Sequence, residues 1–420
     1  MKTQDGNDSK AVRSAYIWNT IGSMLNAFQS VVMLMVITRV CGMTTAGVFT
    51  FAYANANLFL TLGCFGMRNF EASDVGPKYS FKAYARSRIV TCVAMVLCSW
   101  LWLAWSANAN GYGWDKTMAV ALMTLMKGTD AVEDVCDGAY QQSGRLDIAG
   151  KLLTFRVAST IGVFCFVILR TGDLVHATLG GFVWTIAVLV IGITFILKTQ
   201  SLPHAHDEAP VGSALALLIE CTPLFLASFL LFYVGNAPKY AIDALLGDAE
   251  QAVYGFIAMP VFVVGLLAQF VYAPLVQPMS GMWMAGNRRS FARTMLRQIG
   301  IICVISLACV LAAAIAGPPV LSALYACDLG PWRGQLCVLV AGGGLLALAS
   351  LFTMGVTIMR AQRRLVVGYA FVAFAALLLS GPLVRAWGIN GAVVCYVSCM
   401  VMLAGWFGYE FVRKLREPER

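Results

Sequence analysis

Charged and amide side chains recur along one otherwise apolar stretch near residues 117–140 and just beyond it. They are Lys127, Asp130, Glu133, Asp134, Asp137, Gln141 and Arg145. Steps of three and four residues gather these side chains on one arc of a helix, with Glu133 at its side, because each residue turns the helix by about 100°. A charged arc that faced lipid would be costly, so it must face water or a partner helix. The arc therefore predicts a substrate or ion pathway, in which one carboxylate could bind a coupling proton or sodium ion.

The same pattern also has a purely structural interpretation. The end of this helix could project into the cytoplasm, with Lys127 and Arg145 neutralising the acids. However, the four acids between Asp130 and Asp137 exceed what these two cations can neutralise. We therefore favour the pathway over the solvated helix end.

Three amides share one helix face in the first apolar stretch. Asn19, Asn26 and Gln29 could line a cavity, and they could equally form hydrogen bonds between helices, which is at least as common for amides in membranes.

Two further polar side chains lie in the stretch that opens the second half of the chain. Glu220 precedes Pro223, and a proline in a membrane helix frees backbone carbonyls. The pair predicts a hinge beside a carboxylate, or else a kink near the helix end. Lys239 is a candidate contact for a phosphate or saccharide, with an interfacial anchor as the alternative.

The composition indicates which elements must position these residues. Of the 420 residues 59% are hydrophobic and 12% are charged, and the mean hydropathy is +0.75. A soluble domain carries roughly a quarter charged residues, so lipid must solvate most of this exterior. We predict an all-α integral membrane protein whose apolar stretches are long enough to cross a core of roughly 30 Å. About twelve spans are expected, near 14–38, 47–67, 87–107, 117–140, 150–170, 175–197, 213–236, 251–276, 294–316, 334–357, 365–384 and 390–412.

The cations predict the orientation. Most of the 30 Lys and Arg fall on one side if both termini are cytoplasmic, as the positive-inside bias requires. The net charge of +9 is therefore a signal of topology, and no nucleic-acid partner is expected because base-contacting elements are absent. Around the cytoplasmic mouth we place Arg68, Asp74, Arg88 and Arg360, whose cations would attract an anionic substrate.

A weak internal repeat predicts two lobes. Residues 42–51 align without gaps on residues 247–256, at an offset of about half the chain. The matched positions are Gly42 with Gly247, Val48 with Val253, Phe49 with Tyr254, and Phe51 with Phe256. Two six-helix lobes in the same orientation suit a transporter that rocks around a central cavity. We assign residues 1–200 to the first lobe, 201–212 to a cytoplasmic linker and 213–420 to the second lobe.

Five stretches of the chain carry a family resemblance. They are FAYANANL (51–58) with GMRNFEASD (66–74), EDVCDGAYQQSGRLD (133–147), and NAPKYAID (236–243) with EQAVYGF (250–256). These stretches resemble the bacterial polysaccharide-biosynthesis flippases of the multidrug/oligosaccharidyl-lipid/polysaccharide (MOP) exporter superfamily, whose fold is MATE-like. The sequence departs from that pattern at Asp137, where an aromatic residue or His would be expected.

The resemblance implies a flippase in the bacterial plasma membrane. It would move polyprenyl-diphosphate-linked oligosaccharide units to the outer leaflet by alternating access, for a surface polymer such as O-antigen, capsule or exopolysaccharide. Its partners would be the lipid-linked oligosaccharide, membrane lipids and polysaccharide assembly proteins.

Two other functions compete with the flippase. A cation-coupled multidrug exporter of MATE type would use the acids of residues 117–140, and the basic mouth argues against it. A membrane polysaccharide polymerase or ligase would need a large outer loop, whereas the expected outer loops are short. We therefore do not expect this protein to be an enzyme. No metal-type Cys or His spacing occurs, so we expect no cofactor beyond a coupling H+ or Na+.

Overall fold

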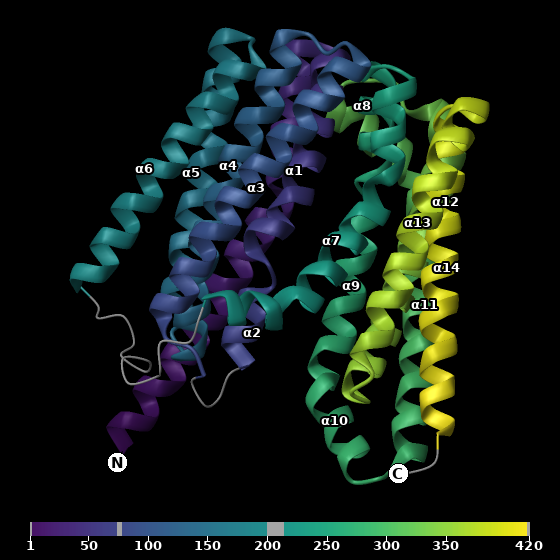
Figure 1. Ribbon diagram of the computed structural model, residues 1–420. Coiled ribbons are helices and arrows are strands. Elements are labelled where there is room, and N and C mark those ends of the chain that lie inside the picture. Colours follow the sequence, from purple (N-terminus) through teal and green to yellow (C-terminus); the bar gives the residue numbers. More distant parts are fainter. Residues whose placement is uncertain (1, 74–77, 200–213, 418–420) are drawn as a thin grey trace. The chain divides into compact units, whose positions relative to one another are not determined.

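The computed structural model describes residues 2–73, 78–199 and 214–417, with side chains from residue 14 onward except 73, 197–199, 362 and 363. All secondary structure in these ranges is helical (Figure 1). Ten stretches are long and apolar enough to cross a membrane. One of them, Ser14–Cys64, holds two helices, and the charged helix α4 (Trp114–Gln142) adds another. The described chain therefore holds ten to twelve helices that could cross a membrane, in line with the predicted number of about twelve.

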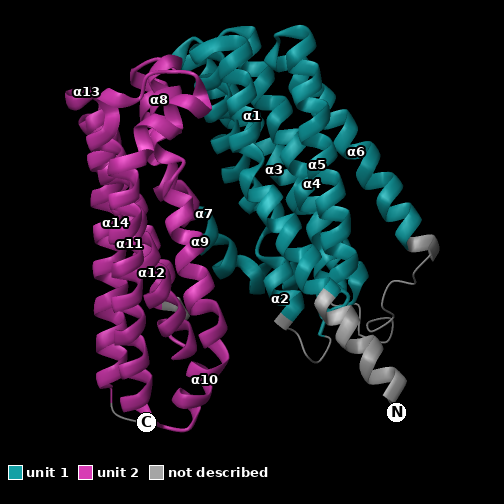
Figure 2. Cartoon of the chain, turned by 180° about the vertical axis from the view of Figure 1, so that it is seen from behind, with its two compact units in different colours: residues 1–229 teal, residues 230–420 magenta. Residues whose placement is uncertain are grey.

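The chain forms two compact units, residues 1–229 and 230–420 (Figure 2). The helices of the first unit are α1 (Lys2–Cys64), α2 (Met67–Ser73), α3 (Phe81–Asn110), α4, α5 (Leu146–Thr171), α6 (Leu174–Thr199) and the first half of α7 (Ala214–Leu245). The second unit holds the rest of α7, α8 (Asp248–Ala258), α9 (Val261–Tyr272), η1 (Ala273–Leu275), α10 (Val276–Met284), α11 (Arg288–Tyr325), η2 (Gly330–Trp332), α12 (Arg333–Ile358), α13 (Gln362–Trp387) and α14 (Ile389–Arg416).

The boundary between the two units lies inside α7, between Phe229 and Leu230. The expected linker, residues 201–212, lies outside the described residues. The first half of α7 packs on the first unit. The rings of Phe65 and Phe225 stack with centroids 4.5 Å apart, and the Ser87 hydroxyl donates to the Ala214 carbonyl at 3.3 Å. These contacts place the start of α7 with the helices that precede it.

In each unit the internal repeat lies at the joint between the first and the second span. Gly42 interrupts α1 with φ 85°, a conformation that favours glycine, and Gly247 is the residue before α8. The aromatic pair that follows each glycine is fully buried: Phe49 and Phe51 in the first unit, Tyr254 and Phe256 in the second.

Each unit also closes this joint with a tyrosine at the end of its third span. Phe51 meets Tyr112 edge-on at 5.9 Å, and Phe256 stacks on Tyr325 at 4.2 Å. The same aromatic contact at the same place supports a duplicated architecture.

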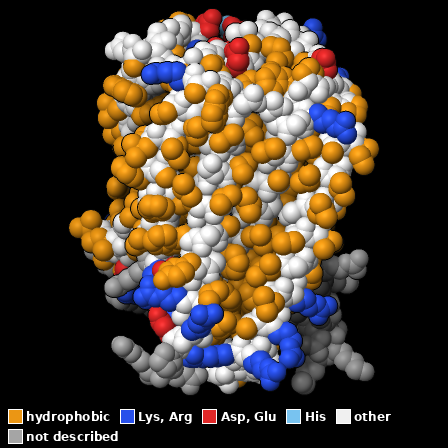
Figure 3. Space-filling model, turned by 90° about the vertical axis from the view of Figure 1, so that its right-hand side faces the viewer, with side chains coloured by type: hydrophobic (Ala, Val, Ile, Leu, Met, Phe, Trp, Pro, Cys, Tyr) orange, Lys and Arg blue, Asp and Glu red, His pale blue; other side chains and the backbone are white. Residues whose placement is uncertain are grey.

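The described surface is suited to lipid. Large apolar side chains such as Leu101, Ile191, Val304 and Ile315 are exposed. On the face drawn in Figure 3, hydrophobic side chains cover a broad band, and Lys and Arg gather toward the lower end. Apolar surface of this extent needs a hydrocarbon solvent. The protein is therefore a multi-pass membrane protein.

The close packing of α1 on α5 depends on small residues. A Cβ atom on Gly150 would lie 2.6 Å from backbone atoms of Trp18 and Asn19. Small residues let membrane helices approach closely and gain van der Waals contact. The backbone of α1 can therefore reach α5 only if position 150 carries no side chain.

We expect Gly150→Ala to push α1 away from α5 and to lower the free energy of unfolding by about 1–3 kcal/mol, as overpacked cores do. Thermal unfolding of the purified protein in detergent measures this. The matched control is Gly162→Ala in the same helix, because a Cβ there meets no atom within 4 Å. Equal melting temperatures for the two variants would show that the contact does not matter.

Candidate functional site

The charged arc of α4 faces the interior of the first unit, where side chains from other helices meet it. Arg156 of α5 contacts Asp130 at 2.7 Å and Glu133 at 2.5 Å. Its guanidinium also donates to the Thr185 hydroxyl of α6 at 3.0 Å. Lys127 pairs with Asp130 at 2.9 Å. Glu133 and both cations of this group are almost fully buried.

An amide of α1 completes this half of the cluster. The Lys127 ammonium donates to Gln29 Oε1 at 2.8 Å and lies 4.9 Å from the centre of the Tyr53 ring. Gln29 therefore acts between helices, as the second of the two interpretations of the amide face predicts.

The other half of the cluster joins α4 to α2 and α3. Arg88 of α3 contacts Asp134 at 2.6 Å and donates to the Gly63 carbonyl at 2.6 Å. Arg68 of α2 contacts Asp137 at 3.1 Å and donates to Gln141 Oε1 at 3.1 Å. These bonds connect the C-terminal part of α4 to α2 and α3, the two helices that precede it.

The cluster is balanced in charge. Four carboxylates, on Asp130, Glu133, Asp134 and Asp137, face four cations. The cations are Lys127, Arg68, Arg88 and Arg156. A buried charge is tolerated when a partner of opposite sign and further hydrogen bonds satisfy it. The ion pairs thus account structurally for all four acids, and a pathway through them stays a prediction.

One expectation about the cations was wrong. Arg88 does not lie at an open cytoplasmic mouth: its side chain is 3% exposed, because it reaches inward to Asp134. Arg145 lies beyond the end of α4. It precedes α5 and pairs with Asp147 at 3.0 Å, with its side chain 47% exposed.

Sequence reasoning did not single out Arg156 as a site residue. A usable signal existed: Arg156 lies inside a predicted span, where an unpaired cation would be costly.

The remaining predicted residues are dispersed. Asn19 lies at the contact of α1 with α5, and Asn26 has a buried Oδ1 without a hydrogen-bond partner among the described residues. Glu220 pairs with Lys78. Arg360 is exposed and follows the end of α12 in a left-handed conformation, with φ 56°. Asp74 lies outside the described residues.

Glu71 of α2 is a buried carboxyl that sequence reasoning missed. The residue is 1% exposed, and neither carboxyl oxygen has a hydrogen-bond partner among the described residues. It packs so tightly on α4 that a Cβ on Gly138 would collide with it. Burial raises the pKa of Glu71 from 4.5 to about 8. At neutral pH this fifth carboxyl is therefore mostly protonated, which keeps the cluster neutral.

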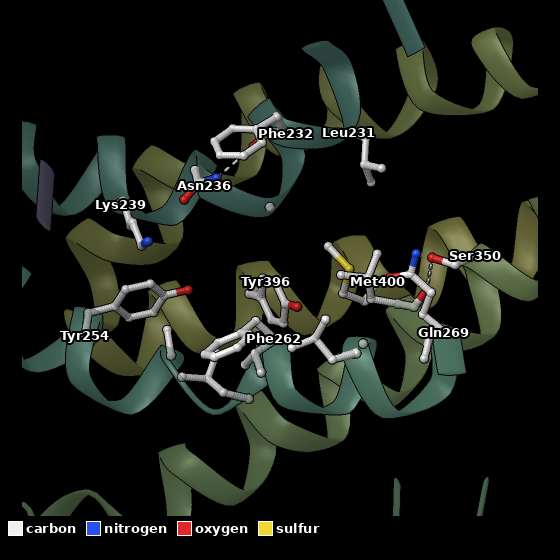
Figure 4. A pocket seen from close by; sticks show the side chains of 18 of the residues that line it. Leu231, Phe232, Asn236, Lys239, Tyr254, Phe262, Gln269, Ser350, Tyr396 and Met400 are labelled. Atoms are coloured by element: carbon white, nitrogen blue, oxygen red, sulfur yellow. Dashed lines mark hydrogen bonds between the residues drawn. The ribbon is translucent and has the colours of Figure 1, made fainter. Parts of the chain in front are cut away.

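The second unit contains a cavity of about 530 Å³ between α7, α8, α9, α12 and α14. Lys239 of α7 is its charged lining residue among those described, and no Asp or Glu lines it. Figure 4 shows the Lys239 ammonium and the Tyr254 hydroxyl pointing into the same space, with Gln269 reaching into it from the other end. Lys239 forms no hydrogen bond or ion pair with any described residue. The cavity is thus apolar and aromatic, with one uncompensated positive charge.

The described chain holds no cluster of side chains suited to bind a metal ion. No group of three or more His, Cys, Asp or Glu side chains there could hold a metal ion.

Comparison with known proteins identifies the fold. No protein-family model and no curated protein sequence matches the chain. Solved structures do match. An inward-facing multidrug resistance MATE family transporter of the MOP superfamily superposes with a TM-score of 0.71 at 12% identity, over 96% of this chain and 100% of that one. An outward-facing conformation of such a transporter matches with a TM-score of 0.62 at 14% identity, over 97% and 96%. The MATE multidrug transporter DinF-BH in complex with R6G gives 0.69 at 13% identity, over 96% and 95%. The chain therefore has a MATE-like transporter fold.

We expect Arg156→Met to destabilise the protein strongly, by about 3–5 kcal/mol, because it leaves Glu133 buried without its cation. The double variant Arg156→Met/Glu133→Leu should recover most of that loss, since apolar groups can replace a buried ion pair. Thermal unfolding in detergent measures both, with the exposed Arg86→Met as the control. A double variant no more stable than Arg156→Met would contradict the assigned pair.

A second expectation concerns the buried carboxyl of Glu71. Between pH 4.5 and about 8 the folded chain holds a proton that the unfolded chain has lost. The free energy of unfolding should therefore fall as the pH rises through this range, by about 3 kcal/mol at most at pH 7. Glu71→Gln should flatten this slope and melt above the wild type at pH 8. The exposed Glu250→Gln is the control. An unchanged slope in Glu71→Gln would rule out the assigned proton.

Proposed function

We propose that this protein is an exporter that moves amphipathic organic molecules across a bacterial plasma membrane by alternating access. The observation that carries the proposal is the fold, which matches both an inward-facing and an outward-facing transporter over nearly the whole chain. A fold that solved proteins adopt in both states supports a cycle between those states. Each unit is packed internally and has its own aromatic joint between its first two spans. This organisation is consistent with rocking of one unit against the other.

The comparisons favour a multidrug exporter over other transporters of this fold. Three of the matching structures are described as multidrug transporters, and one of them holds R6G. An apolar, aromatic cavity of about 530 Å³ is within the size range of pockets that bind drug-sized ligands. On this proposal the chain protects its host from amphipathic toxic compounds.

A lipid-linked oligosaccharide is the second candidate. Its support is the resemblance carried by residues 51–74, 133–147 and 236–256, together with the uncompensated cation of Lys239 in the cavity. A polyprenyl diphosphate is anionic, and a lone cation in an apolar site attracts such a group. Polysaccharide assembly proteins would then be its partners.

Coupling to H+ or Na+ remains part of the proposal. The four acids of α4 already hold cations of the protein itself. A coupling ion bound there would have to displace Lys or Arg, which a small ion does poorly against a hydrogen-bonded guanidinium.

Deletion in the native host separates the two substrate classes. A multidrug exporter predicts greater sensitivity to amphipathic drugs with unchanged surface polymer. A flippase predicts lost polymer and accumulated lipid-linked oligosaccharide. Complementation with Asp134→Asn should restore less activity than the wild type, because Arg88 loses its buried partner, whereas the exposed Lys151→Ala should restore all of it. A deletion strain with neither phenotype would contradict the export proposal.

A further inference from the structure

We infer that the cavity of the second unit is a binding site for the negatively charged group of an amphipathic molecule, with Lys239 as its anchor. The inference rests on the proposed export function and adds the charge of the substrate and the place where it binds.

The charge of the cavity carries the first step. Lys239 faces a space whose described lining holds no carboxylate, and it has no hydrogen bond or ion pair with a described residue. An ammonium within a membrane span is costly unless something of opposite charge meets it. The first unit shows the contrast, since each cation of its buried cluster has a carboxylate within about 3 Å. The missing counter-charge at Lys239 is therefore one that a ligand can bring.

The hydrogen-bonding groups carry the second step. Tyr396 of α14 is 4% exposed and lines the cavity, yet its hydroxyl has no hydrogen-bond partner among the described residues. An unmet buried hydroxyl costs free energy that a ligand acceptor would recover. Gln269 of α9 adds an amide from the far end of the same space (Figure 4). Lys239, Tyr396 and Gln269 can each donate a hydrogen bond to oxygen atoms of one ligand.

The remaining lining sets the shape and polarity of the ligand. Phe232, Tyr254 and Phe262 present rings, and Leu266, Leu346 and Met400 present aliphatic surface. Rings and aliphatic groups bind flat or apolar portions of a molecule. The site thus suits a molecule with one anionic group, such as a phosphate, sulfonate or carboxylate, attached to an apolar or ring-containing body. An amphipathic cation would meet the Lys239 charge instead.

Two dyes with the same xanthene ring test this charge preference. Fluorescein is anionic at neutral pH and rhodamine 6G is cationic. Fluorescence anisotropy with the purified full-length protein in neutral detergent gives the Kd of each dye. Wild type should bind fluorescein more tightly than rhodamine 6G. Lys239→Met, which keeps the chain length without the charge, should weaken fluorescein binding about tenfold or more. Lys239→Arg should stay within about threefold of the wild type.

Two further variants control the assignment. Tyr396→Phe should weaken fluorescein binding about two- to tenfold, the effect of losing one hydrogen bond. Lys82→Met removes an exposed cation of α3 and should leave the Kd unchanged. Thermal unfolding reports whether each variant is folded, and Lys239→Met should melt no lower than the wild type because it removes an unpaired charge from the cavity. Equal fluorescein affinity for wild type and a folded Lys239→Met would overturn the inference, as would tighter binding of rhodamine 6G to the wild type.

Competition identifies the source of the anion. Undecaprenyl phosphate should displace fluorescein, and undecaprenol should not, if the natural ligand is a lipid with an anionic headgroup. Displacement by soluble aromatic sulfonates but not by the lipid would point to a free organic anion, and either result supports the anion site. A wild type that binds fluorescein through Lys239 but transports no substrate would keep the site and refute export. Transport that does not depend on Lys239 would support export and refute the anion site.

Discussion

The structure depends on one constraint, which is that ionised groups inside a membrane span need a partner of opposite charge. In the first unit four acids of α4, from Asp130 to Asp137, form a cluster, and α2, α3 and α5 each supply an arginine to meet them. Because each pair joins two elements, the charges determine which helices surround α4 and in which rotation about their axes. Glu71 forms no ion pair with a described cation, and it keeps its proton near neutral pH because burial raises its pKa. In this unit the pairing of charges and the packing of helices therefore depend on each other.

The second unit repeats the architecture without repeating the charge. Its aromatic joint at Tyr254 and Phe256 mirrors that at Phe49 and Phe51, yet the cavity beside it holds a single cation and no carboxylate in its described lining. One duplicated scaffold thus carries two different interiors. The first is neutralised by its own residues and is suited to rigidity, whereas the second leaves room and charge for a ligand. This asymmetry gives the export proposal a place for the substrate.

Much of the fold could be predicted from the sequence, because length, hydropathy and a short repeat are local properties. The spans, the charged arc of α4 and the break at Gly42 are all visible in one dimension. The partners of the arc are not, because Arg88 and Arg156 meet α4 only after helices from distant parts of the chain pack together. Glu71 gives no local signal, since its burial follows from contact with Gly138 on another helix.

Transport by the purified wild-type protein in proteoliposomes tests the central claim most directly. Fluorescein and rhodamine 6G are enclosed in separate vesicles, and the loss of each dye is followed against protein-free vesicles of the same lipid. The account predicts that the protein accelerates the release of both dyes, and that of the anion more strongly, because the substrate cavity carries the charge of Lys239. Release of both dyes at the rate of protein-free vesicles would contradict export. Acceleration of the cation alone would contradict the role given to the cavity of the second unit.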